Sequence, residues 1–311
     1  MSKLNGIMLV DKPKSITSHD AVDAMRRITG LRKIGHTGTL DPLATGLLIL
    51  CVGKATKLAQ FLTLDTKEYE AEIRLGMRSS TYDAEGIIPE SEAEVPELTV
   101  EAIESILEKF RGDIVQKVPP FAAVKVNGQR LYKKARRGEE VKSPEREVRI
   151  DSLSLLDYNS GMLKINVSCS KGTYIRSLAN DIGETIGCGA YLSELRRTRV
   201  GKFYIGDAIT LEGAEKLMAD GNLESYLYAT EKALDYPAVK LDSSFTPYII
   251  QGRNPRKENI VDIIGSFKED EIISLCDESG KIMAVGRSLV SSSSLSDFSG
   301  ENFFKYVRVL N

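Results

Sequence analysis

The sequence is poor in the residues that build metal sites and disulfide frameworks. It has only two histidines, His19 and His36, and four cysteines that lie far apart without a Cys-x-x-Cys pair. Zinc sites and disulfide-rich folds need close pairs or clusters of such residues. We therefore expect no zinc site and no disulfide.

Long apolar runs are also missing. The first run, at residues 6–10, is broken at once by Asp11 and Lys12, so it is too short for a signal peptide or a membrane span. With 42% hydrophobic residues the chain can still bury a sizeable core, and its length suggests about two domains. We expect a globular, cytoplasmic protein that is not bound to a membrane.

Excess charge of one sign is absent from the whole chain but present locally. The 42 basic and 44 acidic residues leave a formal charge of −2, which gives no general sign of a nucleic-acid partner. Residues 117–150, however, hold ten basic and four acidic side chains, and basic residues recur at 26–33 and 196–202. Such patches fit a one-sided footprint for a polyanion, and they also fit ordinary solvated surfaces.

Two common phosphate-binding motifs are absent too. No glycine in residues 35–53 has the spacing of a Walker loop, and the dinucleotide fingerprint is missing. What this region does contain, at residues 35–46, is a loop with three glycines, three threonines and one carboxylate, that of Asp41. The chemistry of the chain is concentrated here.

Asp41 has a setting that suits a reactive carboxylate. Pro42 disfavours helical backbone for the residue before it, so Asp41 should be extended and its carboxylate held in one direction. Glycine allows close backbone approach to a ligand, and threonine hydroxyls can hold phosphate or sugar oxygens. The apolar run at residues 47–52 follows directly and predicts a buried strand that anchors the loop. The alternative is that Asp-Pro marks an ordinary turn.

Periodicity and capping signals predict the order of the elements. We expect strands at residues 6–10, 47–52, 67–75, 148–157 and 163–169, and helices at 18–29, 55–62, 99–111, 173–183 and 211–219. Beyond a junction at residues 234–238, short strands at 272–276 and 282–285 flank a hairpin turn, and residues 291–294 form a loop. This end of the chain therefore predicts a small β domain.

The loop at residues 35–46 reads Gly-His-Thr-Gly-Thr-Leu-Asp-Pro-Leu-Ala-Thr-Gly. It resembles, almost letter for letter, the catalytic motif of the TruB-type tRNA pseudouridine synthases. The resemblance implies that Asp41 is the nucleophile. It also implies an α+β fold, with a mixed catalytic core around a central antiparallel sheet flanked by helices. A thumb-like segment would be inserted at about residues 117–150. The expected domains are residues 1–236 and a PUA-like RNA-binding β domain at 237–311.

Two further residues are expected at the active site. The alternation in residues 67–75 points Tyr69 inward, where its ring could stack on a base or simply belong to the core. Arg176 falls in the first turn of a helix for which Thr173 is the expected cap. The helix dipole disfavours a cation there by ~0.3–1 kcal/mol, so an anion should compensate. That anion would be Asp41, or else another acid. The segments around Tyr69 and Arg176 resemble the family's tyrosine and arginine motifs.

The same resemblance supplies the remaining site residues. It implies that Tyr174 and Leu195 line a uridine pocket, although Leu195 alone would be assigned to the core. His36 would fill the space left by the target base, contact the RNA, or merely close a turn. Candidates for contact with the RNA backbone are Lys12, Lys57, Lys125, Tyr132 and Arg136.

The implied activity is isomerisation of uridine to pseudouridine at position 55, in the T loop of tRNA. This reaction needs no redox step and no metal, so we expect no cofactor. The target base must be flipped out of the RNA, and Asp41 would then attack C6 of the ring or C1′ of the sugar. Tyr69 or a water would remove the proton from C5. The expected partner is the T arm of tRNA. A stand-alone enzyme without guide RNA is favoured, because the chain lacks the lysine-rich tails of eukaryotic guide-dependent relatives.

Two other functions stay open at this point. A non-catalytic RNA-binding or RNA-folding protein could keep the same scaffold. A small-molecule enzyme such as a glycosidase would need a second carboxylate near Asp41, for which Asp83 is the nearest candidate.

Overall fold

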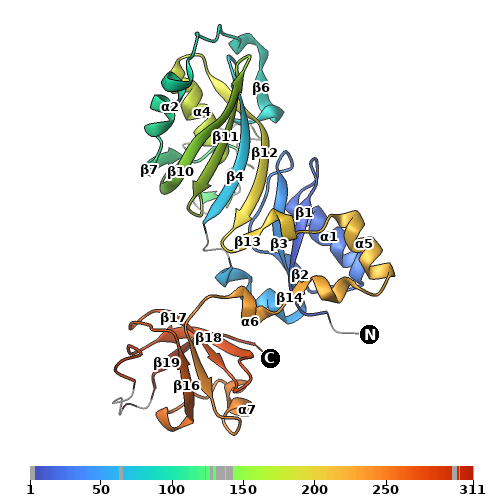
Figure 1. Ribbon diagram of the computed structural model, residues 1–311, viewed down its shortest axis with the longest axis vertical. Coiled ribbons are helices and arrows are strands. Elements are labelled where there is room, and N and C mark those ends of the chain that lie inside the picture. The colour runs from blue at the N-terminus through green and yellow to red at the C-terminus, as the bar shows by residue number, and fades with distance from the viewer. Residues whose placement is uncertain are drawn as a thin grey trace.

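The structure is a computed structural model that describes residues 4–62, 66–122, 124–126, 129–130, 137, 143–295, 300 and 302–310, with backbone alone at 125–126 and 129–130. It contains a large mixed sheet with helices against it and a separate five-stranded sheet at the C-terminal end (Figure 1). The expected α+β fold with a small C-terminal β domain is therefore confirmed. None of the described helices is long and apolar enough to cross a membrane.

The large sheet has ten strands. Its main path runs β14-β1-β3-β12-β4-β11-β10-β7, and β2 and β13 pair with β3 and β12 respectively. The bounds are β1 (Gly6–Lys12), β2 (Ile34–His36), β3 (Thr45–Val52), β4 (Lys67–Leu75), β7 (Gly112–Lys117), β10 (Glu145–Asn159), β11 (Met162–Cys169), β12 (Ala190–Val200), β13 (Phe203–Tyr204) and β14 (Leu227–Tyr228). Two short hairpins lie outside it, β5 (Arg78–Ser79) with β6 (Ile87–Ile88) and β8 (Lys125–Val126) with β9 (Gln129–Arg130).

The centre of this sheet departs from the expected antiparallel pattern. β12 pairs in parallel with β3, with Arg196 opposite Thr45 and Arg197 opposite Gly46, whereas the other pairs are antiparallel. Gly46 makes this approach possible, because a Cβ there would lie 2.3 Å from the Arg197 carbonyl oxygen. Its φ of +99° is likewise one that residues with a Cβ rarely adopt. The strand β12 was not among the sequence predictions, yet it joins the two halves of the sheet.

Helices and turns follow local signals closely. The α-helices are α1 (Ser18–Thr29), α2 (Val100–Glu108), α4 (Ile175–Ile186), α5 (Leu211–Ala219), α6 (Thr230–Ala233) and α7 (Thr246–Ile249). The 3₁₀ helices are η1 (Gly53–Phe61), η2 (Ala84–Gly86), η3 (Pro89–Ser91), η4 (Ile205–Asp207), η5 (Leu223–Tyr226) and η6 (Lys257–Asn259). Thr17 caps α1 in a capping box with Asp20, and Gly30 ends it in the left-handed conformation, as expected. The helix expected at residues 55–62 is instead the 3₁₀ helix η1.

Both faces of β1 and β3 are buried, which explains their unbroken apolar runs. One face packs with α1, α4 and the inward side of β4, where Met8 and Leu50 are fully buried. The other face contributes Ile7 and Leu47 to a second cluster. That cluster also contains Val285 of the C-terminal sheet, so the core and the C-terminal sheet share apolar packing.

The C-terminal sheet has the order β16-β15-β17-β18-β19. Its strands are β15 (Ala238–Leu241), β16 (Ile260–Ile264), β17 (Ile272–Cys276), β18 (Ile282–Ser288) and β19 (Phe304–Val309). The expected hairpin joins β17 to β18, closed by a 3.0 Å bond from the Asp277 N–H to the Lys281 carbonyl. Ala238 begins the first of these strands, close to the expected boundary at residue 237.

The expected insertion leaves the edge of the large sheet. β7 and β10 pair as the outermost strands, with Lys117 at the end of β7 opposite Glu145 at the start of β10, so the segment between them begins and ends at the edge of the sheet. Tyr132 and Arg136 lie outside the described residues, and so does the side chain of Lys125. Their proposed contacts with RNA stay predictions.

Candidate active site

Five of the predicted site residues meet in one pocket of about 440 Å³. The Asp41 loop, β4, the start of α4 and β12 form its walls, and these elements bring together Asp41, Tyr69, Tyr174, Arg176 and Leu195. Asp41 is the only acidic residue among the described residues that line the pocket. Side chains that are more than 150 positions apart in the chain thus surround a single carboxylate.

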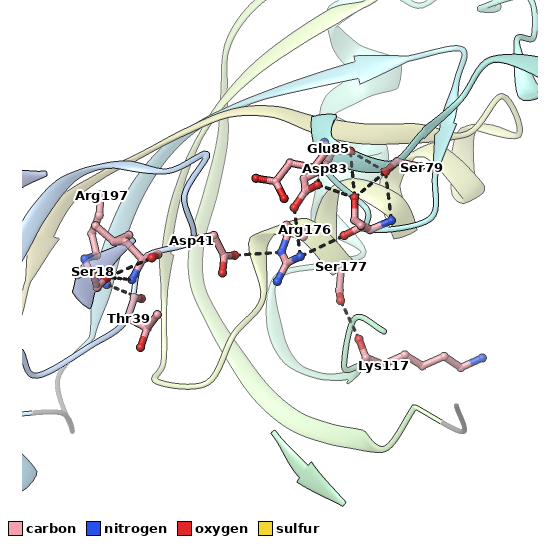
Figure 2. A network of polar contacts seen from close by, with 12 residues as sticks. Ser18, Thr39, Asp41, Ser79, Asp83, Glu85, Lys117, Arg176, Ser177 and Arg197 are labelled. Carbon is pink, nitrogen blue, oxygen red and sulfur yellow. Dashed lines mark hydrogen bonds and ion pairs between the residues drawn. The ribbon is translucent and has the colours of Figure 1, made fainter. Parts of the chain in front are cut away.

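Arg176 lies between two carboxylates. Its Nε lies 3.1 Å from Oδ2 of Asp41, and its Nη1 donates a 3.1 Å hydrogen bond to Oδ2 of Asp83 (Figure 2). The contact with Asp41 is an ion pair whose angle is poor for a hydrogen bond. The expected pairing of Arg176 with Asp41 is present, and so is the alternative, a bridge to another acid.

The two carboxylates differ in exposure. The Asp41 side chain is 43% exposed, whereas that of Asp83 is 4% exposed. Oδ1 of Asp83 accepts hydrogen bonds from the Thr81 hydroxyl and the Glu85 N–H, which leaves Oδ2 for the arginine. Asp83 does not line the pocket. It is therefore placed to hold Arg176, and a second catalytic carboxylate of the glycosidase type is not supported.

The Asp41 loop is fastened to the start of α1. The Ser18 hydroxyl donates to the Leu40 carbonyl at 3.1 Å and accepts from the Leu40 N–H at 2.8 Å. The Pro42 carbonyl accepts from the Ser15 N–H at 2.9 Å. These bonds hold the backbone on both sides of Asp41, so the direction of its carboxylate is set by the fold.

Arg197 is a residue of this site that the sequence interpretation missed. It is 2% exposed and lines the pocket, although we had grouped it with a surface cluster at residues 196–202. Its Nε donates to the Leu47 carbonyl at 2.7 Å, its Nη2 to Gly38 at 3.1 Å and its Nη1 to Thr39 at 3.5 Å. The alternation of buried positions along β12 is the signal that could have identified it.

The rest of that basic cluster is engaged within the protein. Arg196 pairs with Asp11 at 2.7 Å, Arg199 pairs with Glu68 at 2.8 Å, and Lys202 pairs with Asp235. Arg196 and Arg199 keep side chains that are 42% and 37% exposed, so a footprint for a polyanion at residues 196–202 stays a prediction, except at the buried Arg197. These charges stabilise contacts between strands and loops.

Lys12 is also buried, which contradicts its predicted contact with the RNA backbone. It is fully inaccessible at the end of β1, and its Nζ donates to the Pro13 and Ile16 carbonyls at 2.8 Å each. Burial lowers the pKa of Lys12 to about 8, and the negative charge of Asp41 partly opposes this. A side chain enclosed in this way cannot reach a phosphate without a change of conformation.

The two tyrosines of the pocket are held as neutral phenols. Burial raises the pKa of Tyr69, while the charge and a hydrogen bond of Arg197 act in the opposite direction. Burial also raises the pKa of Tyr174, whose ring lies 5.9 Å from the Arg146 guanidinium. Tyr174, not the expected Thr173, is the N-cap residue of α4, and no side chain caps this helix. The Thr173 hydroxyl donates instead to the Ser170 carbonyl.

His36 and Lys57 lie outside the pocket lining. His36 pairs with Leu50 across β2 and β3, and burial together with the Arg197 charge lowers its pKa, so the imidazole is neutral at pH 7. Lys57 lies on η1 with its Nζ 3.4 Å from the Val309 carbonyl of the C-terminal sheet. Their proposed contacts with RNA stay predictions. Among the described residues, no group of His, Cys, Asp and Glu is arranged to hold a metal ion.

Comparison with known protein families gives two matches along the chain. Residues 26–175 match the model of the TruB family pseudouridylate synthase N-terminal domain, and residues 176–236 match the tRNA pseudouridylate synthase B C-terminal domain. The chain is 46% identical over 238 residues to proteins called tRNA pseudouridine synthase B from Francisella tularensis subsp. tularensis (strain WY96-3418) and Francisella philomiragia. In both cases the match covers 76% of this chain and 79% of the relative.

Solved structures support the fold. An archaeal box H/ACA sRNP Nop10-Cbf5 complex contains a chain with a TM-score of 0.78 at 24% identity, covering 99% of this chain and 87% of that one. An H/ACA RNP bound to a substrate RNA containing 2′-deoxyuridine gives a TM-score of 0.79 at 24% identity, covering 99% and 86%. At this identity the likeness concerns the fold alone.

Proposed function

The chain belongs to the TruB family of pseudouridylate synthases, and from this premise we propose that it converts uridine 55 in the T loop of tRNA through attack by Asp41. The enzyme class, an RNA pseudouridine synthase acting on tRNA, follows from the family and its named relatives. A non-catalytic RNA-binding protein is thereby excluded. What we propose is the target position and the role of each side chain.

The observation that carries the proposal is the position of Asp41 as the single acid of the pocket, paired with Arg176. An ionised carboxylate beside a fixed guanidinium stays charged and aimed, as a nucleophile must. Because Asp83 holds the other side of Arg176, the guanidinium cannot follow Asp41 when that carboxylate forms a bond. The Asp41 carboxylate can thus move toward the substrate while Arg176 stays in place.

The apolar walls of the pocket suit a flipped base. Tyr69 and Leu195 lie on neighbouring strands, and Tyr174 lies at the start of α4, so that a pyrimidine ring would be enclosed between rings and an aliphatic side chain. Since burial raises the pKa of Tyr69, its hydroxyl is a hydrogen-bond donor at neutral pH. This favours a water molecule as the acceptor of the C5 proton.

We further propose that the enzyme acts without a guide RNA. The relatives with 46% identity are named as tRNA enzymes, whereas the likeness to chains of H/ACA particles concerns the fold at 24% identity. Purified chain incubated with a bare tRNA transcript should therefore form pseudouridine. A requirement for added RNA or protein would contradict the stand-alone form.

The test of Asp41 is tritium release from tRNA that carries 5-tritiated uridine. The wild type should release one tritium per tRNA, and a transcript with cytidine at position 55 should release none. Asp41→Asn keeps the size of the side chain but loses the nucleophile, so the rate should fall by ~10⁴-fold or more while tRNA binding persists.

The matched control is Asp113→Asn, because Asp113 also pairs with an arginine, Arg149, at 3.2 Å, but on an exposed strand away from the pocket. Its activity should stay within about twofold of wild type. Comparable loss in both variants, or activity retained in Asp41→Asn, would refute the role of Asp41.

A further inference from the structure

The pocket has more buried positive charge than its acids neutralise. Arg176 contacts both Asp41 and Asp83. Lys12 and Arg197 are both buried; Lys12 donates to backbone carbonyls, and Arg197 donates to backbone carbonyls and to the Tyr69 hydroxyl. Within the described part of the chain, no carboxylate oxygen lies within 4.0 Å of either cation. Two buried cations without a carboxylate partner are costly to maintain, which calls for a reason.

Of these two cations only Arg197 faces the pocket. It lines the cavity with Asp41 and Tyr69, whereas Lys12 does not. A guanidinium has five N–H donors, and three of those of Arg197 bond to carbonyls. Tyr69, to which Arg197 also makes a hydrogen bond, lines the same pocket. Fixed positive charge therefore borders the space that a base would enter.

The reaction puts negative charge into that space by either route of attack. If Asp41 adds to C6, the electron pair of the C5–C6 double bond moves onto the ring and its O4. If Asp41 attacks C1′, the C1′–N1 bond breaks and its electron pair leaves with the uracil, shared by N1, O2 and O4. In both cases the C1′–N1 bond breaks, C5 bonds to C1′, the bond to Asp41 breaks and restores the free carboxylate, C5 loses its proton and N1 gains one. The net change is an isomerisation with no redox partner.

We propose that Arg197 is a further residue of this reaction, whose buried guanidinium stabilises the negative charge that develops on the uracil ring. This inference rests on the proposed function of the pocket. A cation fixed in place before the reaction needs no rearrangement as charge develops, and a water-poor site strengthens its effect.

The fold fixes Arg197 in the required way. Its carbonyl partners belong to β3 and to the Asp41 loop, so the guanidinium and the nucleophile are held by the same backbone segment (Figure 2). The parallel pairing of Arg197 with Gly46 brings the two strands together at this point. The residue that positions the loop thus also supplies the charge.

The experiment compares two substrates that differ in how well the ring carries negative charge. Fluorine at C5 withdraws electrons and stabilises the anionic ring, so 5-fluorouridine depends less on a protein cation. Single-turnover rates are measured as consumption of uridine or 5-fluorouridine at position 55, read from nuclease digests of the tRNA. The variants are Arg197→Met and Arg197→Gln, which remove the charge; Gln keeps two donors for the loop carbonyls.

We expect both variants to lose ~10²–10³-fold on uridine and at least ~10-fold less on 5-fluorouridine. Lys12→Met is the matched control, because it removes the other unpaired buried cation without touching the pocket lining. Its losses on the two substrates should be equal. Arg197→Lys, which keeps the charge, should recover part of the loss on uridine.

Equal losses on the two substrates in the Arg197 variants would overturn the inference and leave Arg197 as a structural support for the loop. A substrate difference of the same size in Lys12→Met would also overturn it. Failure of the proposed function is distinguishable, because it would appear in the wild type or in Asp41→Asn acting on uridine alone. If Arg197→Met does not fold, the rates of Arg197→Gln decide.

Discussion

The cations around Asp41 and the cations between the two sheets differ in burial and in partners. Lys12, Arg176 and Arg197 are buried and bonded to carbonyls or carboxylates. A second cavity, of about 540 Å³, lies between the catalytic core and the C-terminal sheet. Its rim carries exposed cations from both sides, with no ion pair among the described residues: Arg32, Lys33, Lys54 and Lys281.

This difference suggests that the buried cations serve the reaction and the exposed cations serve binding. A buried cation acts in a medium of low dielectric constant and keeps one position, so it can favour one charge distribution in the substrate. An exposed lysine is hydrated and mobile, and it attracts phosphates through a field that salt screens. We therefore expect Arg176 and Arg197, which line the pocket, to set the rate, and the exposed cations of the second cavity to set the strength and salt dependence of tRNA binding.

The largest effect should come from Arg176, which serves both carboxylates. Arg176→Lys keeps the charge but cannot contact Asp41 and Asp83 with the same geometry, because lysine lacks the planar fork. We expect kcat to fall by ~10³-fold with tRNA affinity within about threefold of wild type. Arg78→Lys is the control, since Arg78 makes an exposed pair with Glu184 of α4, and it should change kcat by less than about twofold. A similar loss of kcat in Arg176→Lys and Arg78→Lys would contradict the distinction between buried and exposed cations.

Asp83→Asn should have a smaller effect on rate and a larger one on stability than Asp41→Asn. Asn can still accept hydrogen bonds from the Thr81 hydroxyl and the Glu85 N–H, but the buried Arg176 loses one of its two negatively charged partners. We expect kcat to fall by ~10²-fold and the free energy of unfolding by about 1–3 kcal/mol. Since Asp41 is partly exposed, Asp41→Asn should cost less than about 1 kcal/mol. Urea unfolding and tritium release, measured on both variants, check whether Asp83→Asn loses more stability and Asp41→Asn loses more activity.

Lys12 gives a prediction about pH. Its pKa in the folded protein, about 8, is below the unfolded value of 10.5, so between these pH values the unfolded chain binds more protons. The free energy of unfolding contributed by Lys12 should therefore rise with pH across this window. Between pH 7.5 and 10, wild type should gain about 1–2 kcal/mol relative to Lys12→Met in urea titrations. An identical pH dependence in the two proteins would show that Lys12 is not a buried cation in solution.

The smallest effects should come from single lysines of the second cavity. Lys54→Gln on the core and Lys281→Gln on the C-terminal sheet should each weaken tRNA binding by about two- to threefold and reduce the slope of log K against log salt by about 1. Their kcat values should not change. The control is Lys109→Gln at the end of α2, which Figure 1 places at the opposite end of the molecule. If the slope of log K against log salt is unchanged in both Lys54→Gln and Lys281→Gln, the RNA binds elsewhere.

Much of the site could be predicted because its signals are local. The alternation of residues 67–75 located Tyr69 on the inward face of β4, and Thr17 and Gly30 marked the ends of α1. The misplaced charge of Arg176 at the start of α4 correctly required an anion. Each of these predictions depends on neighbours within a few positions of the chain.

The errors concern charges whose burial is not local. Lys12 was assigned to RNA and Arg197 to a surface cluster, because a basic residue in a sequence gives no sign of what will cover it. The role of Asp83 as the second partner of Arg176 was likewise missed, since its candidate role was a catalytic one. The predicted helix at 55–62 became the 3₁₀ helix η1.

The sequence alone determined the strands β1, β3 and β4, the ends of α1 and the loop that presents Asp41, since periodicity, capping and the restriction that Pro42 imposes all act within a few residues. Only the tertiary structure decided which cations are buried. The bonds that enclose Arg197 join residues 150 to 159 positions apart, through a parallel strand pair that no local pattern specifies. The sequence gives the charge of a side chain, but the strength of its electrostatic effect depends on how much water the whole fold removes from around it.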